Sequence, residues 1–146
     1  MYQDTITLFN RKRGTAGTGD TWYPTVIKNV NLSIDRAAVV EKYGAESKDN
    51  AILNVRYTVK DGDIIVAGKP WMPPKAWDKT MDSITFAGGS EFDFFWAGEW
   101  TGGVKQDAEY GAEGFYGFMN RTHDFVFAIS SVSKLSVIPH FEITGK

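Results

Sequence analysis

Carboxylates and aromatic side chains alternate in EFDFFWAGEW, residues 91–100, the stretch whose residue types best fit a chemical role. Glu91, Asp93 and Glu99 could supply paired carboxyl groups beside tryptophan rings, as in a glycosidase cleft. There, one acid stays protonated in an apolar pocket while a second stays ionised. Because no second catalytic motif supports this assignment, we favour the alternative of an ordinary strand whose acids face water.

The other residue types that catalyse reactions or bind metals do not occur at spacings that indicate a catalytic or metal site. His123 and His140 lie in different segments, without the spacing of a metal site. The chain contains no cysteine, which excludes a thiolate nucleophile, a cysteine zinc site and a disulfide framework. Serine nucleophile elbows, HExxH and GxGxxG motifs are also missing from the sequence. We therefore predict a protein that is not an enzyme, with no catalytic residue, no cofactor and no metal site.

Three adjacent basic residues, Arg11, Lys12 and Arg13, precede the glycine-rich run GTAGTGD. This composition predicts a long exposed hairpin loop over Arg11–Asp20. The basic run could touch a DNA backbone, although a run this short is more often the solvated base of a loop. With a net charge of −2, contact with DNA would be local and transient. No apolar run approaches the roughly 18–20 residues of a membrane helix, so no membrane partner is expected.

Three prolines and two tryptophans fall within GKPWMPPKAW, residues 68–77. Pro73-Pro74 cannot lie in a central strand, so we predict a stiff extended loop that carries Trp71 and Trp77. Two interpretations are open. The loop presents a preorganised contact surface to another protein or a sugar, or its tryptophans close one end of a barrel.

The composition indicates a single all-β domain over residues 1–146. Aromatic residues make up 14% of the chain and accompany 15 glycines, a mixture typical of strands and turns. A chain of this length buries roughly 70% of its unfolded surface, enough for one core. The start MYQDTITLF lacks a basic segment followed by an apolar one, which favours an intracellular product.

The clearest element is a hairpin over Ala51–Ala67. Apolar residues alternate from Leu53 to Val59, as in a half-buried strand, and Asp61-Gly62 fits a two-residue type I′ turn. This turn sets three cross-strand pairs: Val59 with Ile64, Tyr57 with Val66, and Lys60 with Asp63.

Further alternating segments surround this hairpin and could complete its sheet. The predicted strands are Thr5–Phe9, Trp22–Ile34, Asp82–Phe86, 92–96, Asp124–Ile129 and Leu135–Ile143, the last two flanking Ser130–Lys134. The predicted helices are Ala37–Tyr43, capped by Asp35, and Gln106–Thr122, capped by Asp107. Together they predict a small antiparallel β-barrel or sandwich with long hairpin loops and one or two short helices.

Several blocks of the sequence together resemble a family of small proteins of tailed bacteriophages and prophages of Gram-positive bacteria. The blocks are DTITLFN, WYPTVIKNVNLSIDRAAVVEKYGAESKDNA, GKPWMPPKAW, EFDFF with GEW, and MNRTHDFVFAISSVSKLSVIPHFEITGK. The similarity covers nearly the whole chain. This family is similar to head-closure (stopper) or minor capsid proteins, small β-barrels that assemble as rings below the portal.

The resemblance implies a structural virion protein of the head–tail connector. Such a subunit would form a homo-oligomeric ring and dock between the portal or adaptor and the tail proteins, in the virion and, during assembly, in the host cytoplasm. Ring interfaces need rigid aromatic or arginine anchors. The candidates are Trp22, Tyr23, Trp71, Trp77, Arg11, Lys12 and Arg13. The alternative is a carbohydrate-binding module or a glycosidase-like phage protein that uses residues 91–100.

Overall fold

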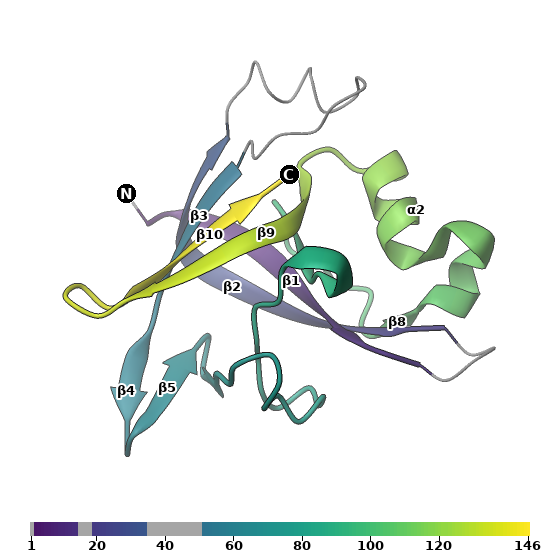
Figure 1. The fold of residues 1–146 in the computed structure, drawn as a ribbon. Helices are drawn as coiled ribbons and strands as arrows, with labels where there is room; N and C mark the ends of the chain where they lie inside the picture. The colour runs from purple at the N-terminus through teal and green to yellow at the C-terminus, as the bar shows by residue number, and fades with distance from the viewer. Residues whose placement is uncertain (1, 15–18, 35–50) are drawn as a thin grey trace.

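Six antiparallel strands close into a small β-barrel (Figure 1). The computed structural model describes residues 2–14, 19–34 and 51–146. The strands follow the order β1-β7-β9-β10-β3-β2, and β2 pairs again with β1 to complete the ring. Their bounds are β1 Asp4–Lys12, β2 Thr21–Ile34, β3 Ala51–Arg56, β7 Phe94–Trp96, β9 Val126–Leu135 and β10 His140–Gly145. The prediction of a small antiparallel β-barrel is confirmed.

Strand β2 spans 14 residues and joins two parts of the barrel wall. Its first part pairs with β1, and its last four residues pair with β3. The change of partner follows a bulge at Asn29, which the β1 register skips between Lys28 and Val30. Asn29 has a φ of 58°, a left-handed conformation that asparagine tolerates better than most residues. The bulge bends β2, which helps the sheet to close.

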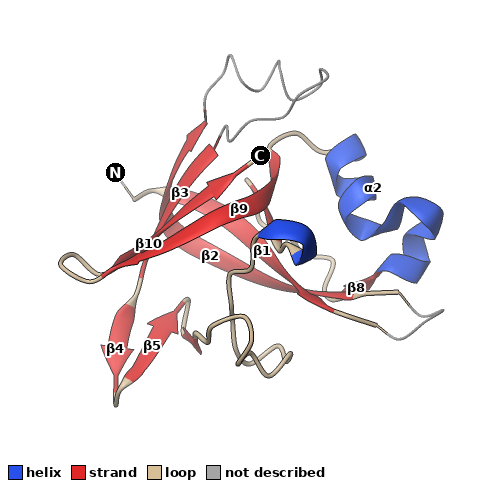
Figure 2. Cartoon of the chain, in the orientation of Figure 1, coloured by secondary structure: helices blue, strands red, loops and turns tan. Residues whose placement is uncertain are grey.

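Strands β1 and β7 are buried on both faces. Leu8 and Phe95 point into the barrel interior, whereas their neighbours Phe9 and Phe94 belong to a second apolar cluster outside the barrel. Phe9 and Phe94 stack there with ring centroids 4.7 Å apart. This second cluster, which we call the outer cluster, is covered by helical segments that lie on one side of the barrel in Figure 2. The chain therefore has two aromatic-rich cores that share one wall.

The covering segment is broken into two helices instead of the single helix predicted over Gln106–Thr122. After β8 (Lys105–Gln106) come the 3₁₀ helix η2 (Asp107–Glu113) and the α-helix α2 (Gly114–Thr122). Gly111 kinks η2, and Gly114 marks the junction with α2; their φ of 67° and 73° are values that glycine adopts freely. The predicted cap, Asp107, acts on α2: its carboxylate accepts the Phe115 N–H at 2.9 Å. It also accepts the Trp22 indole N–H at 2.7 Å.

A separate three-stranded sheet projects from one end of the barrel (Figure 1). It consists of β4 (Thr58–Lys60), β5 (Asp63–Val66) and β6 (Lys69–Pro70). The predicted pairs Val59–Ile64 and Lys60–Asp63 are confirmed, and Asp61 and Gly62 both have the positive φ of a type I′ turn. However, the predicted strand is interrupted at Tyr57 and leaves the barrel. Val59 consequently reaches solvent, with 64% of its surface exposed.

Three other predicted elements differ from the structure or cannot be compared with it. In Asp82–Phe86 only Ile84 forms a bridge, parallel to Trp71, and the short 3₁₀ helix η1 (Gly89–Glu91) follows. The segment Ser130–Lys134, expected between two strands, belongs to β9, and the turn comes at residues 136–139. The alternating residues beyond Ile129 extend β9, and most of their side chains face solvent. The predicted helix Ala37–Tyr43 lies outside the described residues.

We predict that Gly145→Ala lowers the free energy of unfolding by about 1–3 kcal/mol, the usual range for overpacking a core. A Cβ at this position would lie 2.9 Å from the Phe127 Cβ and 3.1 Å from the Phe95 ring, and the Phe127 Cβ is fixed to the backbone. Urea unfolding measures the difference. The matched control is Glu142→Ala, an exposed position on the same strand, expected to change stability by less than about 0.5 kcal/mol. Equal stabilities of the two variants would contradict this account of the core.

Candidate functional site

The three acids of residues 91–100 do not form one cleft. Glu91 is exposed and pairs with Arg13, with 2.8 Å between the carboxylate and the guanidinium. Glu99 is exposed as well, and its carboxylate lies 3.8 Å from the Lys28 ammonium group. Asp93 is buried. The prediction of acids facing water is therefore right for the two glutamates and wrong for Asp93.

The Asp93 carboxyl group connects β1 with the segment that leads into β7. It accepts the Arg11 backbone N–H at 2.8 Å, the Asn10 side-chain N–H at 2.9 Å and the Ala87 backbone N–H at 2.9 Å. Burial raises its pKa from 3.8 to about 7, against the opposing effect of these hydrogen bonds and the Arg11 charge. The carboxyl group can therefore exchange a proton near neutral pH.

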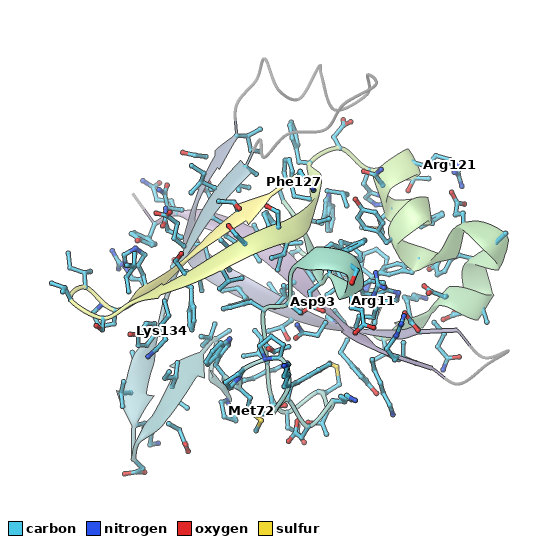
Figure 3. All side chains as sticks on the ribbon, viewed as in Figure 1. Arg11, Met72, Asp93, Arg121, Phe127 and Lys134 are labelled. Carbon is cyan, nitrogen blue, oxygen red and sulfur yellow. The ribbon has the colours of Figure 1, made fainter. Side chains whose placement is uncertain are left out.

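A cavity of about 420 Å³ lies beside Asp93 and is lined mainly by charged side chains. We call it the cationic pocket, because four cationic side chains line it: Arg11, Arg13, Lys75 and Lys79. Its carboxyl groups are Glu91 and Asp93. Figure 3 shows Arg11 and Asp93 adjacent to each other, near the middle of the view. The structure thus brings residues of the basic run, of residues 68–77, which we call the Trp–Pro loop, and of the acidic stretch 91–100 into one site.

Three of the residues that line the cationic pocket carry a buried polar atom without a hydrogen-bond partner among the described residues. These atoms are Arg11 Nε, Trp77 Nε1 and Thr85 Oγ1. Trp77 is 6% exposed and Thr85 only 1% exposed, so bulk water reaches neither side chain freely. A buried polar atom without a hydrogen-bond partner typically lowers the free energy of unfolding by about 1–3 kcal/mol. Three such atoms close together are therefore unusual for a purely structural region.

Arg11 is held rigidly at the wall of this pocket. It was predicted to begin an exposed loop, but Arg11 and Lys12 belong to β1. The Arg11 guanidinium carbon lies 4.6 Å from the ring centroids of both Trp22 and Phe92. It also approaches the Asp20 carboxylate at 3.6 Å. Among the basic interface candidates, Lys12 and Arg13 are the exposed ones.

The aromatic interface candidates pack largely within the chain. Trp22 is 1% exposed and belongs to the outer cluster. Trp71 packs on Phe141 with 4.8 Å between ring centroids, and Trp77 packs edge-on against half-buried Tyr23 at 6.2 Å. Of the two interpretations of the Trp–Pro loop, the packing supports the one in which its tryptophans close an end of the barrel.

Exposed apolar residues at two hairpin ends were missed by the sequence analysis. Val137 and Ile138, in the turn between β9 and β10, are 97% and 71% exposed. With Val59 of β4 they form what we call the hairpin tips. The bases of the two hairpins are tied together, because the Tyr57 hydroxyl donates to the Leu135 carbonyl at 3.1 Å. The two apolar residues directly before Pro139 could have indicated an exposed turn. The sequence analysis instead assigned them to the predicted strand Leu135–Ile143.

The histidines lie apart and serve local packing. His123 contacts the Trp96 ring at 5.1 Å between centroids, and His140 Nδ1 donates to the Ile138 carbonyl at 2.7 Å. Within residues 2–14, 19–34 and 51–146, no group of three or more histidine or acidic side chains is placed to hold a metal ion. No helix in this part of the chain has the length and hydrophobicity needed to span a membrane.

We predict that Thr85→Val raises the free energy of unfolding by about 1 kcal/mol. Valine keeps the shape of the side chain and removes a buried hydroxyl that lacks a partner within the described residues. Thermal or urea unfolding measures the change. Thr7→Val is the matched control: the buried Thr7 hydroxyl donates to the Gly98 carbonyl at 2.8 Å, so its loss should destabilise the chain. A destabilised Thr85→Val variant would show that the hydroxyl is already satisfied.

The pKa of Asp93 predicts a pH-dependent stability. Because the folded-state pKa is raised to about 7, the folded chain holds this proton more tightly than the unfolded chain between about pH 4 and pH 7. The contribution of Asp93 to the free energy of unfolding is complete below pH 4 and is lost as the pH rises towards 7. The free energy of unfolding falls by at most roughly 1.4 kcal/mol per pH unit over this range.

Carbon-13 NMR of the Asp93 carboxyl group provides the direct measurement, with an expected titration midpoint near 7. The Asp93→Asn variant should lack the corresponding slope of stability against pH. A midpoint close to that of an exposed aspartate would contradict the assignment.

Comparison with known proteins places the chain in one family. No curated protein and no solved structure matches it. The protein-family model described as "Family of unknown function (DUF6751)" matches residues 1–146. Because this match covers far more than half of the sequence, the chain belongs to the DUF6751 family.

Proposed function

We propose that the chain is a structural subunit that docks on other protein subunits, in the head–tail connector of a tailed phage. The docking part of the proposal rests on the hairpin tips. Contiguous exposed apolar side chains mark interaction surfaces, and Val137 and Ile138 are adjacent and largely exposed. The phage setting rests on the sequence resemblance alone.

The hairpin tips are suited to docking because their apolar side chains project from elements that hydrogen bonds tie to the barrel. Val137 and Ile138 follow β9, and the Tyr57 N–H donates to the Pro139 carbonyl in the same turn at 3.4 Å. Covering a side chain of this size fully contributes roughly 1.5–3 kcal/mol. A turn anchored in this way loses little conformational freedom when a partner covers it.

The expected partners are further copies of this chain in a ring, together with the portal or adaptor and the tail proteins. Each of the six barrel strands has a neighbour on both sides over part of its length, so among the described residues the closed wall leaves less free edge for association than an open sheet would. Contacts would then use the projecting sheet and the hairpin tips, and a repeated contact between unlike surfaces closes into a ring. Exposed Lys12 is available for local contact with DNA in the channel, whereas Arg13 already pairs with Glu91.

The alternative of a glycosidase-like or carbohydrate-binding protein has weaker support. The Asp93 carboxyl group already accepts three N–H groups, and Glu99 does not line the pocket that contains Glu91 and Asp93. A glycan-binding screen with a parallel hydrolysis assay tests this alternative. Hydrolysis that disappears in Glu91→Gln would favour it over the structural proposal.

We predict that the double substitution Val137→Lys with Ile138→Lys reduces docking at least tenfold while the barrel stays folded. Both positions are exposed, so lysines are accommodated in the free subunit, but they oppose burial in an interface. The measurement is incorporation of the purified variant into portal-bearing heads that lack this protein. Analytical ultracentrifugation over a range of concentrations follows self-association.

The control for this experiment is Met81→Lys with Val104→Lys, which changes two other exposed apolar residues by the same chemistry. Circular dichroism and thermal unfolding show that both double variants are folded. If the folded Val137→Lys, Ile138→Lys variant is incorporated as well as the control, the hairpin tips do not carry the docking.

A further inference from the structure

We propose that the cationic pocket binds the phosphate group of a small phosphate ester or of free phosphate. The residues that carry this inference are Arg11, Arg13, Lys75, Lys79, Trp77 and Thr85. They lie apart in the sequence from the hairpin tips. The inference therefore does not depend on the docking function proposed above.

The charges of the pocket favour an anion. Its cationic side chains exceed its carboxyl groups by two. Arg13 is paired with Glu91, whereas Lys75 and Lys79 are exposed and have no ion pair among the described residues. The Asp93 carboxyl group opposes an anion only weakly, because it accepts three N–H groups and burial raises its pKa to about 7. An incoming anion would thus meet two unpaired ammonium groups.

The unpartnered buried atoms indicate what kind of anion fits. Arg11 Nε and Trp77 Nε1 are donors, and the Thr85 hydroxyl can also donate. Their residues line the pocket from β1, from the Trp–Pro loop and from the segment before Ala87, so a rotation of each side chain would bring its donor to a different wall of the cavity. A tetrahedral phosphate has oxygens pointing in several directions, whereas a carboxylate has two oxygens in one plane. A phosphate therefore matches donors from several walls better than a carboxylate does.

The pocket is built before any ligand arrives. The Arg11 guanidinium lies against the rings of Trp22 and Phe92, and Asp20 approaches it at 3.6 Å, so little entropy is lost on binding. The volume of about 420 Å³ is within the range of small-molecule sites. A duplex does not fit inside such a cavity, and the net charge of −2 gives no broad attraction to nucleic acid. A small phosphate compound is therefore preferred over DNA.

Tryptophan side-chain NMR tests the proposal directly. The probes are inorganic phosphate and glycerol phosphate, titrated into the full chain labelled with nitrogen-15 at its indole groups. We expect the Trp77 indole N–H signal to move with saturation as its hydrogen acquires a phosphate acceptor. Trp71 is the internal control, because its indole N–H is also buried and unpartnered among the described residues but does not line this pocket. Trp77→Phe and Trp71→Phe assign the two signals.

Substitutions then identify the binding groups. Lys75→Ala with Lys79→Ala should weaken phosphate binding at least tenfold, and Thr85→Val should weaken it several-fold without loss of folding. Lys60→Ala with Lys134→Ala removes the same charge outside the pocket and should leave the affinity within twofold. The hairpin-tip variant Val137→Lys, Ile138→Lys should also bind phosphate normally. Failure of docking and failure of phosphate binding are thereby distinguishable.

Three outcomes would overturn the proposal. The first is a Trp77 signal that does not saturate with either phosphate compound, which would indicate only non-specific ionic effects. The second is equal affinity of the Lys75→Ala, Lys79→Ala variant and the Lys60→Ala, Lys134→Ala control. The third is a Trp77 shift produced by a duplex DNA oligonucleotide but by neither small phosphate, which would assign these residues to a nucleic-acid surface.

Discussion

The buried carboxyl group of Asp93 is the interaction on which the arrangement of the barrel wall and the pocket depends. Its oxygens hold Arg11 and Asn10 of β1 against Ala87, and the Asn10 side chain donates further to the Thr85 carbonyl at 2.7 Å. These bonds fix a segment without regular secondary structure beside β1. Burial of the carboxyl group is unfavourable by itself, and the three N–H donors offset only part of that cost, since its pKa remains raised to about 7. The same bonds place Thr85 beside Arg11 in the cationic pocket.

Two aromatic cores on opposite sides of one wall explain the high aromatic content of so small a barrel. The interior is filled from all six strands, whereas the outer cluster needs only β1, β2, β7, β9 and the helical cover. Asp107 secures that cover, since one carboxylate bonds both the Trp22 indole in the wall and the first turn of α2. The helices thus stabilise the side of the barrel from which Arg11 projects.

Elements governed by local pattern could be predicted from the sequence, and those governed by tertiary contact could not. Alternating apolar residues identified most of the barrel strands, although they were misleading for Asp82–Phe86 and for the turn before β10, and Asp61-Gly62 fixed the register of its hairpin. Burial of Asp93 was missed because the donors that satisfy it come from residues more than 80 positions away and from a loop. The pocket was missed for the same reason: three segments, each weak as a motif, meet only in the folded chain. The hairpin tips were missed because an apolar run was assumed to be buried.

The position of β10 between β3 and β9 has a consequence for synthesis of the protein. Strands β3 and β9 pair only through β10, which follows both of them in the chain. While residues 140–145 are still within the ribosome, a nascent chain carries two strands with unpaired backbone groups and an open apolar interior. Neighbouring chains on one polysome could then pair through these edges. Rapid insertion of the final strand, or a chaperone that covers the open barrel, would therefore govern the yield of folded protein.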